Sequence, residues 1–295
     1  MFIGGGHVAD PSEGSQVLHP SSKGHALAGS DWQDAHFNSK RSEYETMLRS
    51  VGLRKGWRVL DAGAGNGSYL PLIAQEVGPT GKITALDVAP ENIAIIERRV
   101  PGWSLDCPVE ALTGDLLSIP APDDSFDAVW CANTFQYLSD EELTTSLHEF
   151  RRVVRPGGLV AIKDFVTPLW NISPGDPARI WRLMAVAQKS NSQLYRTQTT
   201  LELHNHLVEL GLDEVWDELT MVQLRAPLCS AERQFVTGIL GHFARIAQDT
   251  ELSEEDRQFW QSMLDPDECA ATIADGRFCY YDGQVVAVGR VPFPA

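Results

Sequence analysis

The sequence contains few cysteines, and their number and spacing exclude two common roles. Its 295 residues include five cysteines, an odd number, and no two of them form a C-x-x-C pair. Disulfide frameworks and zinc ribbons both require paired spacings, so the thiols are expected to be reduced, as in the cytoplasm. None of the eight histidines stands at metal-ligand spacing from a cysteine or carboxylate motif, and we predict no bound metal.

Long apolar runs are also absent. No stretch approaches the roughly 20 apolar residues that cross a bilayer, and residues 1–30, rich in Gly, Ser and His, lack the apolar core of a signal peptide. We therefore expect a cytoplasmic chain without membrane insertion and with a flexible N-terminal segment over residues 1–30. The alternative for this segment is an ordered arm over the active site or a neighbouring subunit, and a homo-oligomer stays open.

Positive charge is scarce. Lysine and arginine together number 24 against 40 acidic residues, which gives a formal net charge of −16. Because nucleic-acid binding draws on many basic side chains, this balance argues against a nucleic-acid partner and favours a small-molecule substrate.

Apolar segments alternate with helical patterns through most of the chain. With 43% hydrophobic residues the chain can bury a full core, and we favour one decorated domain over two small ones. Strands separated by helices are typical of βαβ units, which predict a parallel sheet. The strand candidates are residues 57–60, 82–87, 109–113, 126–132, 158–165 and 214–224.

The order of these patterns predicts how the chain is divided. A block of helical patterns interrupts the last two strands, so it is an insertion rather than a separate domain. The final strand signals flank Asp282-Gly283, a dipeptide typical of hairpin turns. The expected segments are a helical cap over residues 31–55, a core over residues 56–225 with a lid at residues 166–198, a helical insertion over residues 226–276, and a C-terminal hairpin over residues 277–295 that completes the sheet.

The most informative segment is the stretch VLDAGAGNG at residues 59–67, in which an apolar strand leads into three alternating glycines and then a helix. Without a β-carbon, Gly63, Gly65 and Gly67 can adopt positive φ and bring bare backbone close to a ligand. Dinucleotide-binding loops instead read G-x-G-x-x-G and hold a pyrophosphate. Here the spacing differs, and Asp61 at the strand end would repel a pyrophosphate but suits a cationic ligand.

Four motifs in succession give the chain a family resemblance. They are VLDAGAGNG, ALDVAP, TGDLLSIPAPDDSFDAVWCANTFQYL and FRRVVRPGGLVAIKDF, which together cover most of residues 57–165. In this order they resemble the class I S-adenosylmethionine-dependent methyltransferases, in particular the small-molecule branch similar to the ubiquinone and menaquinone biosynthesis enzymes (methyltransferase type 11). The resemblance implies an α/β fold with a Rossmann-like, mostly parallel seven-stranded sheet flanked by helices. It also implies S-adenosyl-L-methionine as cofactor and a small-molecule acceptor.

The resemblance further implies roles for individual residues. Asp87 would accept hydrogen bonds from both ribose hydroxyls, and Asp115 would accept one from the adenine amino group while Leu116 covers the ring. Asn133 and Gln136 would face the methionine end of the cofactor. The full expected cofactor set is Tyr44, Asp61, Gly63, Ala64, Gly65, Asp87, Val88, Gly114, Asp115, Leu116, Asn133 and Gln136, with Asp61 and the Gly63 backbone meeting the amino group.

A catalytic base is needed if the acceptor is a hydroxyl or an acidic carbon, and the sequence leaves this open. The catalytic candidates are His36 in the N-terminal helix, Asp164 at the predicted end of the fifth strand, and Tyr195 before the next helix. Lys163 and Arg196 are neighbouring alternatives. Aromatic faces can hold a sulfonium cation, and the aromatic residues expected to line the site are Trp32, Phe37, Tyr44, Phe135 and Tyr137.

The predicted function is transfer of a methyl group to a carbon, oxygen or nitrogen atom of a small organic acceptor. The relatives often carry a histidine-rich segment after the fourth strand, where this chain has NTFQY at residues 133–137, so a quinone acceptor is disfavoured. An unusual lid, together with an excess of arginine over lysine that suits a GC-rich bacterial genome, points to specialised metabolism. Two alternatives stay open: a non-catalytic S-adenosylmethionine-binding regulator and, less favoured by the loop spacing, a nicotinamide-dependent oxidoreductase.

Overall fold

A computed structural model gives the structure of residues 19–20, 26–27, 29–189, 197 and 200–294. Most of the expected N-terminal segment, residues 1–30, lies outside these residues, as do Tyr195 and Arg196. Two short strands, β1 (His19–Pro20) and β2 (Ala26–Leu27), pair antiparallel before the first helix.

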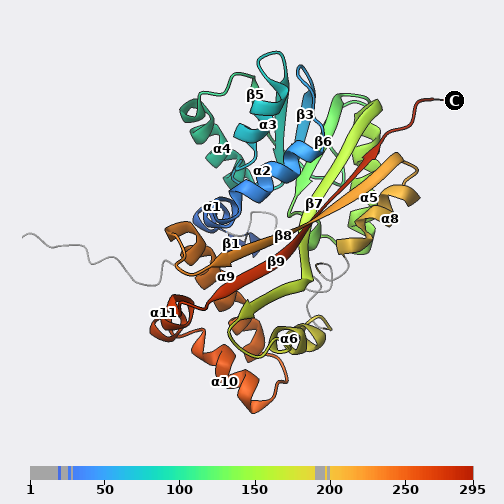
Figure 1. Cartoon of the computed structure of the whole chain (residues 1–295). Helices are drawn as coiled ribbons and strands as arrows, with labels where there is room; N and C mark the ends of the chain where they lie inside the picture. Colours follow the sequence, from blue (N-terminus) through green and yellow to red (C-terminus); the bar gives the residue numbers. More distant parts are fainter. Residues whose placement is uncertain (1–18, 21–25, 28, 190–196, 198–199, 295) are drawn as a thin grey trace, which may run out of the picture.

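The centre of the molecule is a seven-stranded sheet with the strand order β5-β4-β3-β6-β7-β9-β8 (Figure 1). Strands β3 to β7 pair in parallel, and β9 runs antiparallel to both of its neighbours, β7 and β8. The chain order reverses between β3 and β6, which is where open α/β sheets form a crevice for ligands. The expected Rossmann-like, mostly parallel sheet is confirmed, and its strands are β3 (Arg58–Ala62), β4 (Lys82–Asp87), β5 (Val109–Thr113), β6 (Phe126–Ala132), β7 (Val154–Ser173), β8 (Asp213–Arg225) and β9 (Cys279–Arg290).

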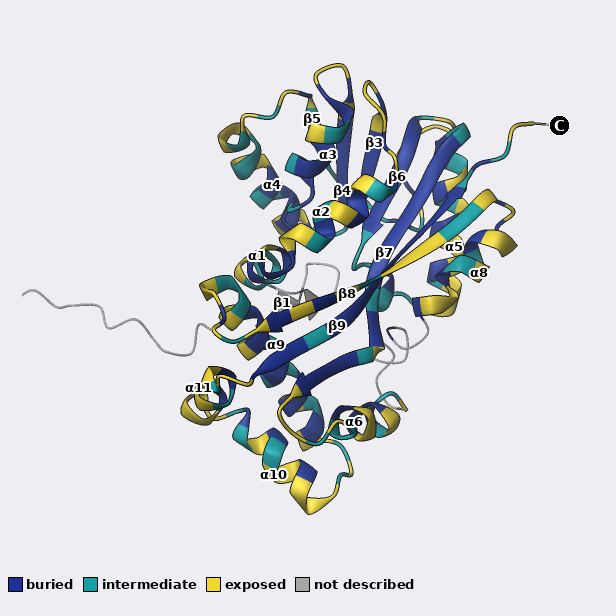
Figure 2. Cartoon of the chain, in the orientation of Figure 1, coloured by how far each residue is buried: buried dark blue, intermediate teal, exposed yellow. Residues whose placement is uncertain are grey.

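Two apolar cores cover the two faces of this sheet. Because side chains alternate along a strand, Val59 of β3 joins the core under α2, α3 and α4, whereas Leu60 joins the core under α5 and α8. The five inner strands are consequently buried along most of their length, whereas the edge strands β5 and β8 are largely accessible (Figure 2). The helices that pack here are α2 (Arg41–Ser50), α3 (Leu70–Val77), α4 (Pro90–Trp103), α5 (Asp140–Val153) and α8 (Leu203–Glu209), with short 3-10 turns η2 (Phe135–Tyr137) and η3 (Thr200–Glu202).

The start of α5 shows the local chemistry that the sequence predicts. The Ser139 hydroxyl accepts a hydrogen bond from the Glu142 backbone N–H, and the Glu142 carboxylate accepts one from the Ser139 N–H. This capping box satisfies two helix N–H groups that have no partner within the helix. It fixes where α5 begins, directly after the η2 turn that borders the ligand crevice.

The expected helical cap over residues 31–55 contains two helices, α1 (Ser30–Ser39) and α2, with Lys40 between them. Lys40 has φ −129° and ψ 20°, outside the helical range, so the helix axis breaks there. Its side chain is buried and forms an ion pair with Asp282 of β9. The break therefore places a charged side chain inside the molecule, between the N-terminal helices and the sheet.

Two further predictions on the C-terminal half are wrong. Residues 279–290 form one continuous strand rather than a hairpin, and Asp282 and Gly283 pair with Val222 and Met221 of β8 in mid-strand. The antiparallel partner of β9 is β8, which precedes the insertion. The first part of the expected lid, residues 166–173, is strand as well, because β7 continues to Ser173.

The helices of the insertion surround the extended ends of β7, β8 and β9 (Figure 1). They build a third core, in which the Trp170 ring of β7 stacks on Phe243 at a centroid distance of 4.2 Å. None of the described helices is both long and apolar enough to span a membrane. The helices of this region are α9 (Ser230–Gln248), α10 (Glu254–Ser262) and α11 (Pro266–Ala274), together with α6 (Arg179–Ala187) of the expected lid.

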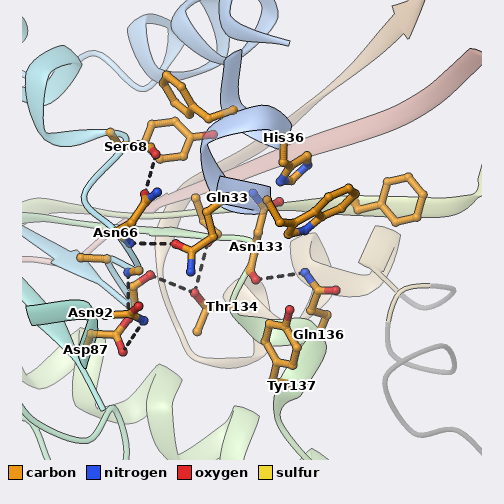
Figure 3. Close-up of a pocket in the computed structure, with 18 of the residues that line it drawn as sticks. Gln33, His36, Asn66, Ser68, Asp87, Asn92, Asn133, Thr134, Gln136 and Tyr137 are labelled. Carbon is orange, nitrogen blue, oxygen red and sulfur yellow. Dashed lines mark hydrogen bonds between the residues drawn. The ribbon is translucent and has the colours of Figure 1, made fainter. Parts of the chain in front are cut away.

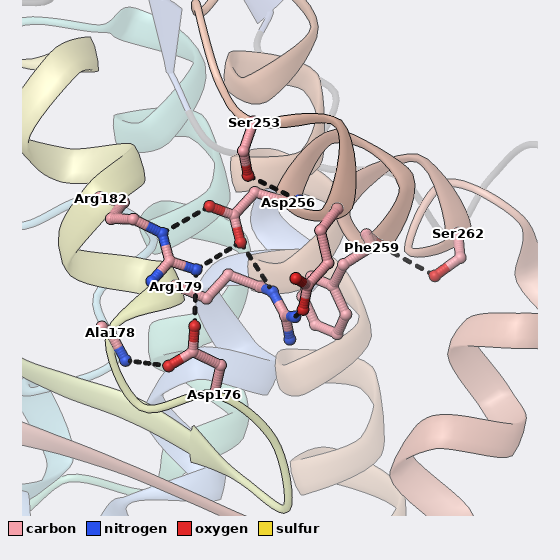
Figure 4. A network of polar contacts seen from close by, with 9 residues as sticks. Asp176, Ala178, Arg179, Arg182, Ser253, Asp256, Phe259 and Ser262 are labelled. Carbon is pink, nitrogen blue, oxygen red and sulfur yellow. Dashed lines mark hydrogen bonds and ion pairs between the residues drawn. The ribbon is translucent and has the colours of Figure 1, made fainter.

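Ion pairs attach α6 to α10 (Figure 4). Asp256, which is 1% exposed, accepts two hydrogen bonds from the Arg182 guanidinium, both at 2.6 Å, and one from Arg179 at 3.1 Å. The Arg179 guanidinium also lies over the Phe259 ring, 4.3 Å from its centroid. Because charged hydrogen bonds with a buried carboxylate are stronger than those at the surface, this network holds α6 against the insertion.

Candidate functional site

A cavity of about 530 Å³ lies at the carboxyl ends of β3, β4 and β6, at the reversal of strand order. Its wall continues from the glycine loop to α1, α9 and β9. We call the part bordered by residues 61–92 and 115–117 the cofactor half. The remainder, the acceptor half, is lined in part by α1, α9 and the extended ends of β7 and β9.

The glycine loop folds as its sequence predicts. Gly63, Gly65 and Gly67 have φ of 74°, 55° and 82°, a region that residues with a β-carbon rarely adopt. A β-carbon on Gly63 would lie 2.4 Å from the Thr134 hydroxyl, and one on Gly65 would lie 2.6 Å from the Gln33 amide oxygen. Thr134 and Gln33 thus pack directly against the backbone of the glycine loop.

Helix α1 lies over this loop, which the sequence did not reveal (Figure 3). The Gln33 amide oxygen accepts a hydrogen bond from the Asn66 backbone N–H at 2.8 Å. Asp34 accepts one from the Asn66 side chain at 2.7 Å and forms a two-fold ion pair with Arg99 of α4. Helix α1 is therefore fastened to the loop and to α4, and it closes one side of the cofactor half.

Asp87 connects the glycine loop to the start of α4. It is 6% exposed, and its carboxylate accepts hydrogen bonds from the backbone N–H groups of Gly65 at 2.8 Å and Ala89 at 2.9 Å. The Asn92 side chain donates a third at 3.1 Å (Figure 3). Burial raises the pKa of Asp87, and these donors oppose the rise. A carboxylate can accept about four hydrogen bonds, so Asp87 has room for a ligand hydroxyl.

Asp61 lines the same wall and lacks a partner for one oxygen. It is 3% exposed, and its Oδ2 has no hydrogen-bond partner among the described residues. Burial, together with the nearby Asp87 charge, raises the pKa of Asp61 to about 8. A buried carboxylate without a partner is costly. A cationic group in the cofactor half would return it to the ionised form.

The other residues of the expected cofactor set divide into two groups. The Asp115 carboxylate accepts a hydrogen bond from the Leu117 N–H at 3.0 Å, and Leu116 is buried beside it on the cavity wall. Gly114 is not on the wall. A β-carbon there would lie 2.6 Å from Leu86, so this glycine serves packing behind the cavity, which corrects its expected role. The expected cofactor residues that do line the cavity are Tyr44, Asp61, Gly63, Ala64, Gly65, Asp87, Val88, Asp115, Leu116, Asn133 and Gln136.

Asn133 and Gln136 form a hydrogen-bonded turn at the boundary of the two halves. The Gln136 side chain donates to the Asn133 backbone oxygen at 3.0 Å (Figure 3). Asn133 has φ 55°, and its amide oxygen accepts a hydrogen bond from Lys163 Nζ at 2.6 Å. Burial and the charge of Lys40 lower the pKa of Lys163 to about 7. Lys163 is thus a support for Asn133 rather than a residue of the cavity wall.

The acceptor half is predominantly aromatic. Trp32 and Phe37 line the cavity as expected and so does Tyr137, whereas Phe135 is buried against Phe150 instead. Helix α9 of the insertion lines this half with side chains three or four residues apart, which lie on one face of the helix. The side chains of this half are Trp32, His36, Lys40, Phe165, Thr167, Thr197, Phe235, Ile239, His242, Phe243 and Tyr280.

His36 is the expected catalytic candidate that the structure places on the wall. Its Nε2 lies 2.9 Å from the Tyr44 hydroxyl, and its ring stacks on Phe235 at a centroid distance of 5.3 Å. Burial and the charges of Lys40 and Lys163 hold the pKa of His36 well below its usual value, so the imidazole is neutral. Among the described residues, its Nδ1 has no hydrogen-bond partner.

Asp164 has a different role from the one predicted. It is buried outside the cavity wall, and its two oxygens accept hydrogen bonds from the backbone N–H groups of Gln136 at 3.2 Å and Phe165 at 2.8 Å. Burial raises its pKa to about 6. Asp164 therefore positions the η2 turn. Tyr195 lies outside the described residues, and its expected role stays a prediction.

The sequence also missed an ion pair in the acceptor half. The side chains of Lys40 and Asp282 are 1% and 0% exposed. Burial lowers the pKa of Lys40, and the charge of Asp282 opposes this shift. The two residues are 242 positions apart in the chain, so no local pattern could have paired them. Within the described ranges, no cluster of three His, Cys, Asp or Glu side chains could hold a metal ion.

Known proteins match the cofactor half in sequence. Residues 59–158 match the family described as Methyltransferase domain. A demethylmenaquinone methyltransferase of Staphylococcus aureus is 28% identical over 122 residues, which are 41% of this chain and 48% of that protein. The chain thus spans about half the length of the curated relatives that it matches.

Solved structures share the fold. A candidate methyltransferase of Bacillus halodurans has a TM-score of 0.55 at 17% identity, covering 85% of this chain and 100% of that chain. The YcgJ protein of Bacillus subtilis has a TM-score of 0.52 at 18% identity, covering 86% and 100%. A Haemonchus contortus phosphoethanolamine N-methyltransferase 2, in complex with phosphomonomethylethanolamine and S-adenosylhomocysteine, has a TM-score of 0.52 at 15% identity, covering 90% and 58%.

Proposed function

We propose that this chain is a class I, S-adenosylmethionine-dependent methyltransferase that transfers a methyl group to a small organic acceptor. The observation that carries the proposal is the single cavity of about 530 Å³, which joins the cofactor half to an aromatic acceptor half. A methyl donor bound at the glycine loop would face an acceptor held by α1, α9 and β9. Aligning the two reactants in this way supplies much of the rate acceleration of a methyl transfer.

The residues of the cofactor half fit S-adenosylmethionine. Asp61 Oδ2, which has no partner among the described residues, would accept a hydrogen bond from the amino group of the methionine moiety. Asp87 has about one lone pair left for a ribose hydroxyl, and we infer that Asp115 and Leu116, which line the same half, contact adenine. A side chain at position 65 would collide with Gln33, so the loop keeps a bare backbone at this point. When bound, the cofactor supplies a methyl group already activated by a sulfonium.

His36 is the residue that would remove a proton from a hydroxyl or acidic carbon of the acceptor. The role requires the tautomer in which Nε2–H donates to the Tyr44 oxygen, because Nδ1, which has no partner among the described residues, then carries the lone pair that accepts the proton. Tyr44 is thus a positioning residue, and its own pKa is raised by burial, so its hydroxyl stays protonated. The rings of Trp32 and Phe235 pack around His36 and shield part of it from water.

Two alternatives make different predictions. A nicotinamide-dependent oxidoreductase would bind a pyrophosphate at a G-x-G-x-x-G loop, and the glycines at residues 63, 65 and 67 have a different spacing. A non-catalytic regulator would bind the same cofactor but would not need His36 or the acceptor half. The five free cysteines favour a cytoplasmic location, and an acceptor of specialised metabolism stays part of the proposal.

Binding and turnover experiments test the proposal. S-adenosylmethionine or S-adenosylhomocysteine at 100 times its dissociation constant is expected to stabilise the fold by ~2.7 kcal/mol, and NAD should give no shift. Turnover is then measured by transfer of an isotope-labelled methyl group to a panel of small aromatic and aliphatic acceptors. Stabilisation by NAD alone would overturn the assignment, and cofactor binding without transfer to any acceptor would favour the regulator.

His36→Gln separates the catalytic role from a structural one. This variant keeps a polar side chain that can contact the Tyr44 hydroxyl but cannot accept a proton. We expect unchanged S-adenosylhomocysteine affinity with transfer slowed by about 10²- to 10⁴-fold, the usual contribution of a general base. The matched control is His204→Gln, on the surface of α8, which should leave transfer unchanged.

A further inference from the structure

Lys40 brings a positive charge into an otherwise apolar part of the cavity. Its Nζ lies 4.2, 5.4 and 5.9 Å from the ring centroids of Phe235, Tyr280 and Phe165. All three rings line the acceptor half. The ammonium is therefore surrounded by the wall that would contact the acceptor.

Asp282 and Lys40 differ in how many of their possible hydrogen bonds are formed. Asp282 accepts from Lys40 and also from the Tyr280 hydroxyl at 2.6 Å and the Gln284 amide at 2.8 Å. An ammonium has three N–H donors, and among the described residues Asp282 is the one hydrogen-bond acceptor of Lys40. Two donors of Lys40 thus face aromatic rings, whereas the carboxylate of Asp282 already has three donors.

A buried ion pair of this kind is expensive and contributes little to stability compared with apolar packing. Its position on a cavity wall makes it a candidate for ligand recognition. The titratable and charged groups around it are Asp282 and Tyr280 of β9, His36 of α1, Glu43 of α2 and Lys163 of β7. Lys40 is the one lysine or arginine among the described side chains that line the cavity, and the Glu142 carboxylate, which also lines it, accepts a hydrogen bond from the Ser139 N–H.

We propose that Lys40 is a specificity-determining residue that binds an anionic oxygen of the acceptor, so that the acceptor half selects ionised phenols or carboxylates and rejects cationic amines. The proposal rests on the proposed function and deepens it. The two spare N–H groups of Lys40 donate to the oxygen, and the aromatic rings hold the body of the acceptor. A protonated amine would be repelled by Lys40 and could not reach Asp282, whose side chain is fully buried behind the cavity wall.

The selection also suits the proposed reaction. A sulfonium cofactor adds a second positive charge to the same cavity, which strengthens the attraction for an anion and the repulsion of an amine. Lys40 gains its place from the break between α1 and α2, and Asp282 holds it there.

Three aromatic probes of similar size test the charge preference. The full chain, with and without saturating S-adenosylhomocysteine, is titrated with para-nitrophenol, benzoate and benzylamine in a calorimeter. We expect one of the two anions to bind at least about tenfold more tightly than benzylamine, the scale of one charged hydrogen bond. Comparing the affinities for para-nitrophenol and benzoate then shows whether the site prefers a phenolate or a carboxylate oxygen. Because ionised para-nitrophenol absorbs visible light, its ionisation when bound should occur about one pH unit lower than in solution.

The variants show whether Lys40 causes the preference. Lys40→Met alone leaves Asp282 buried without a partner, so the double variant Lys40→Met/Asp282→Asn is the folded reference. It should lose the preference for anions and the shift in para-nitrophenol ionisation, and Lys40→Arg should keep both.

An unchanged preference in the double variant, or tighter binding of benzylamine to the original chain, overturns the inference. If the chain still binds S-adenosylhomocysteine normally when one of these two results is found, the proposed function is unaffected. Failure of the original chain to bind S-adenosylhomocysteine removes the proposed function, and the probe titrations without it still decide the role of Lys40.

Discussion

Replacing Asp87 is expected to affect both stability and cofactor binding, and the structure separates the two effects. Asp87→Ala removes the acceptor of the Gly65 and Ala89 backbone N–H groups, at 2.8 and 2.9 Å. Each donor left buried without an acceptor costs about 1–3 kcal/mol. The free energy of unfolding should therefore fall by about 3 kcal/mol, and the melting temperature by roughly 5–10 °C for a chain of this size.

The cofactor effect comes in addition to this loss. If the remaining lone pair of Asp87 accepts a hydrogen bond from a ribose hydroxyl, its removal costs about another 2 kcal/mol of binding free energy, roughly a 30-fold rise in the dissociation constant. Calorimetry with S-adenosylhomocysteine, well below the lowered melting temperature, measures it. Asp87→Asn keeps one acceptor oxygen and should show an intermediate loss of both quantities.

The combination of results decides the role of Asp87. A fall in stability as expected, with unchanged affinity for S-adenosylhomocysteine, would show that Asp87 holds the loop and makes no contact with the cofactor. Unchanged stability would refute the account of the loop itself, because the two N–H groups would then have found other acceptors.

Two further predictions concern a pH dependence and a helix contact. Asp61 has a folded-state pKa of about 8, above its unfolded value, so in the absence of ligand its ionisation destabilises the fold as the pH rises toward 8. Binding of the amino group of S-adenosylhomocysteine requires ionised Asp61, so binding near neutral pH should release a proton. Calorimetry in two buffers of different ionisation enthalpy measures this release, and the affinity for S-adenosylhomocysteine should rise up to about pH 8. Asp61→Asn should abolish both effects. Proton release that persists in this variant would assign it to another group. Asp256→Ala removes the three hydrogen bonds that Arg179 and Arg182 donate to a buried carboxylate. Because both arginines can turn toward water, we expect the free energy of unfolding, measured with denaturant, to fall by about 1–3 kcal/mol. The control Glu255→Ala removes an exposed ion pair of the same network and should cost less than about 1 kcal/mol.

The cofactor half could be predicted from sequence because its residues are continuous in the chain. Strand, glycine loop and helix lie within a few residues of one another, so the positive φ of Gly63 and Gly65 and the place of Asp87 at the end of β4 follow from local rules. Gly114 was the exception. Its missing β-carbon makes room for Leu86, a contact between neighbouring strands that no local pattern announces.

The acceptor half could not be predicted because its residues meet through long-range contacts. Asp282-Gly283 has the composition of a turn, yet Asp282 is buried by its ion pair with Lys40, and Gly283 stays in the strand because Leu169 packs on it at a distance that excludes a β-carbon. Asp164 was expected at a strand end. Strand β7 runs nine residues beyond it, so the rule that ligands gather at strand ends did not apply there.

The length of β7, β8 and β9 has a consequence for how the chain can be divided. Residues 226–276 form an insertion in sequence, but the strands that they cover are the same strands that complete the sheet of the cofactor half. Excising the insertion would uncover Trp170 and Tyr280 and leave three long strand ends without a covering layer, a template for aggregation. The helices of the insertion are therefore part of what keeps the sheet of this chain covered.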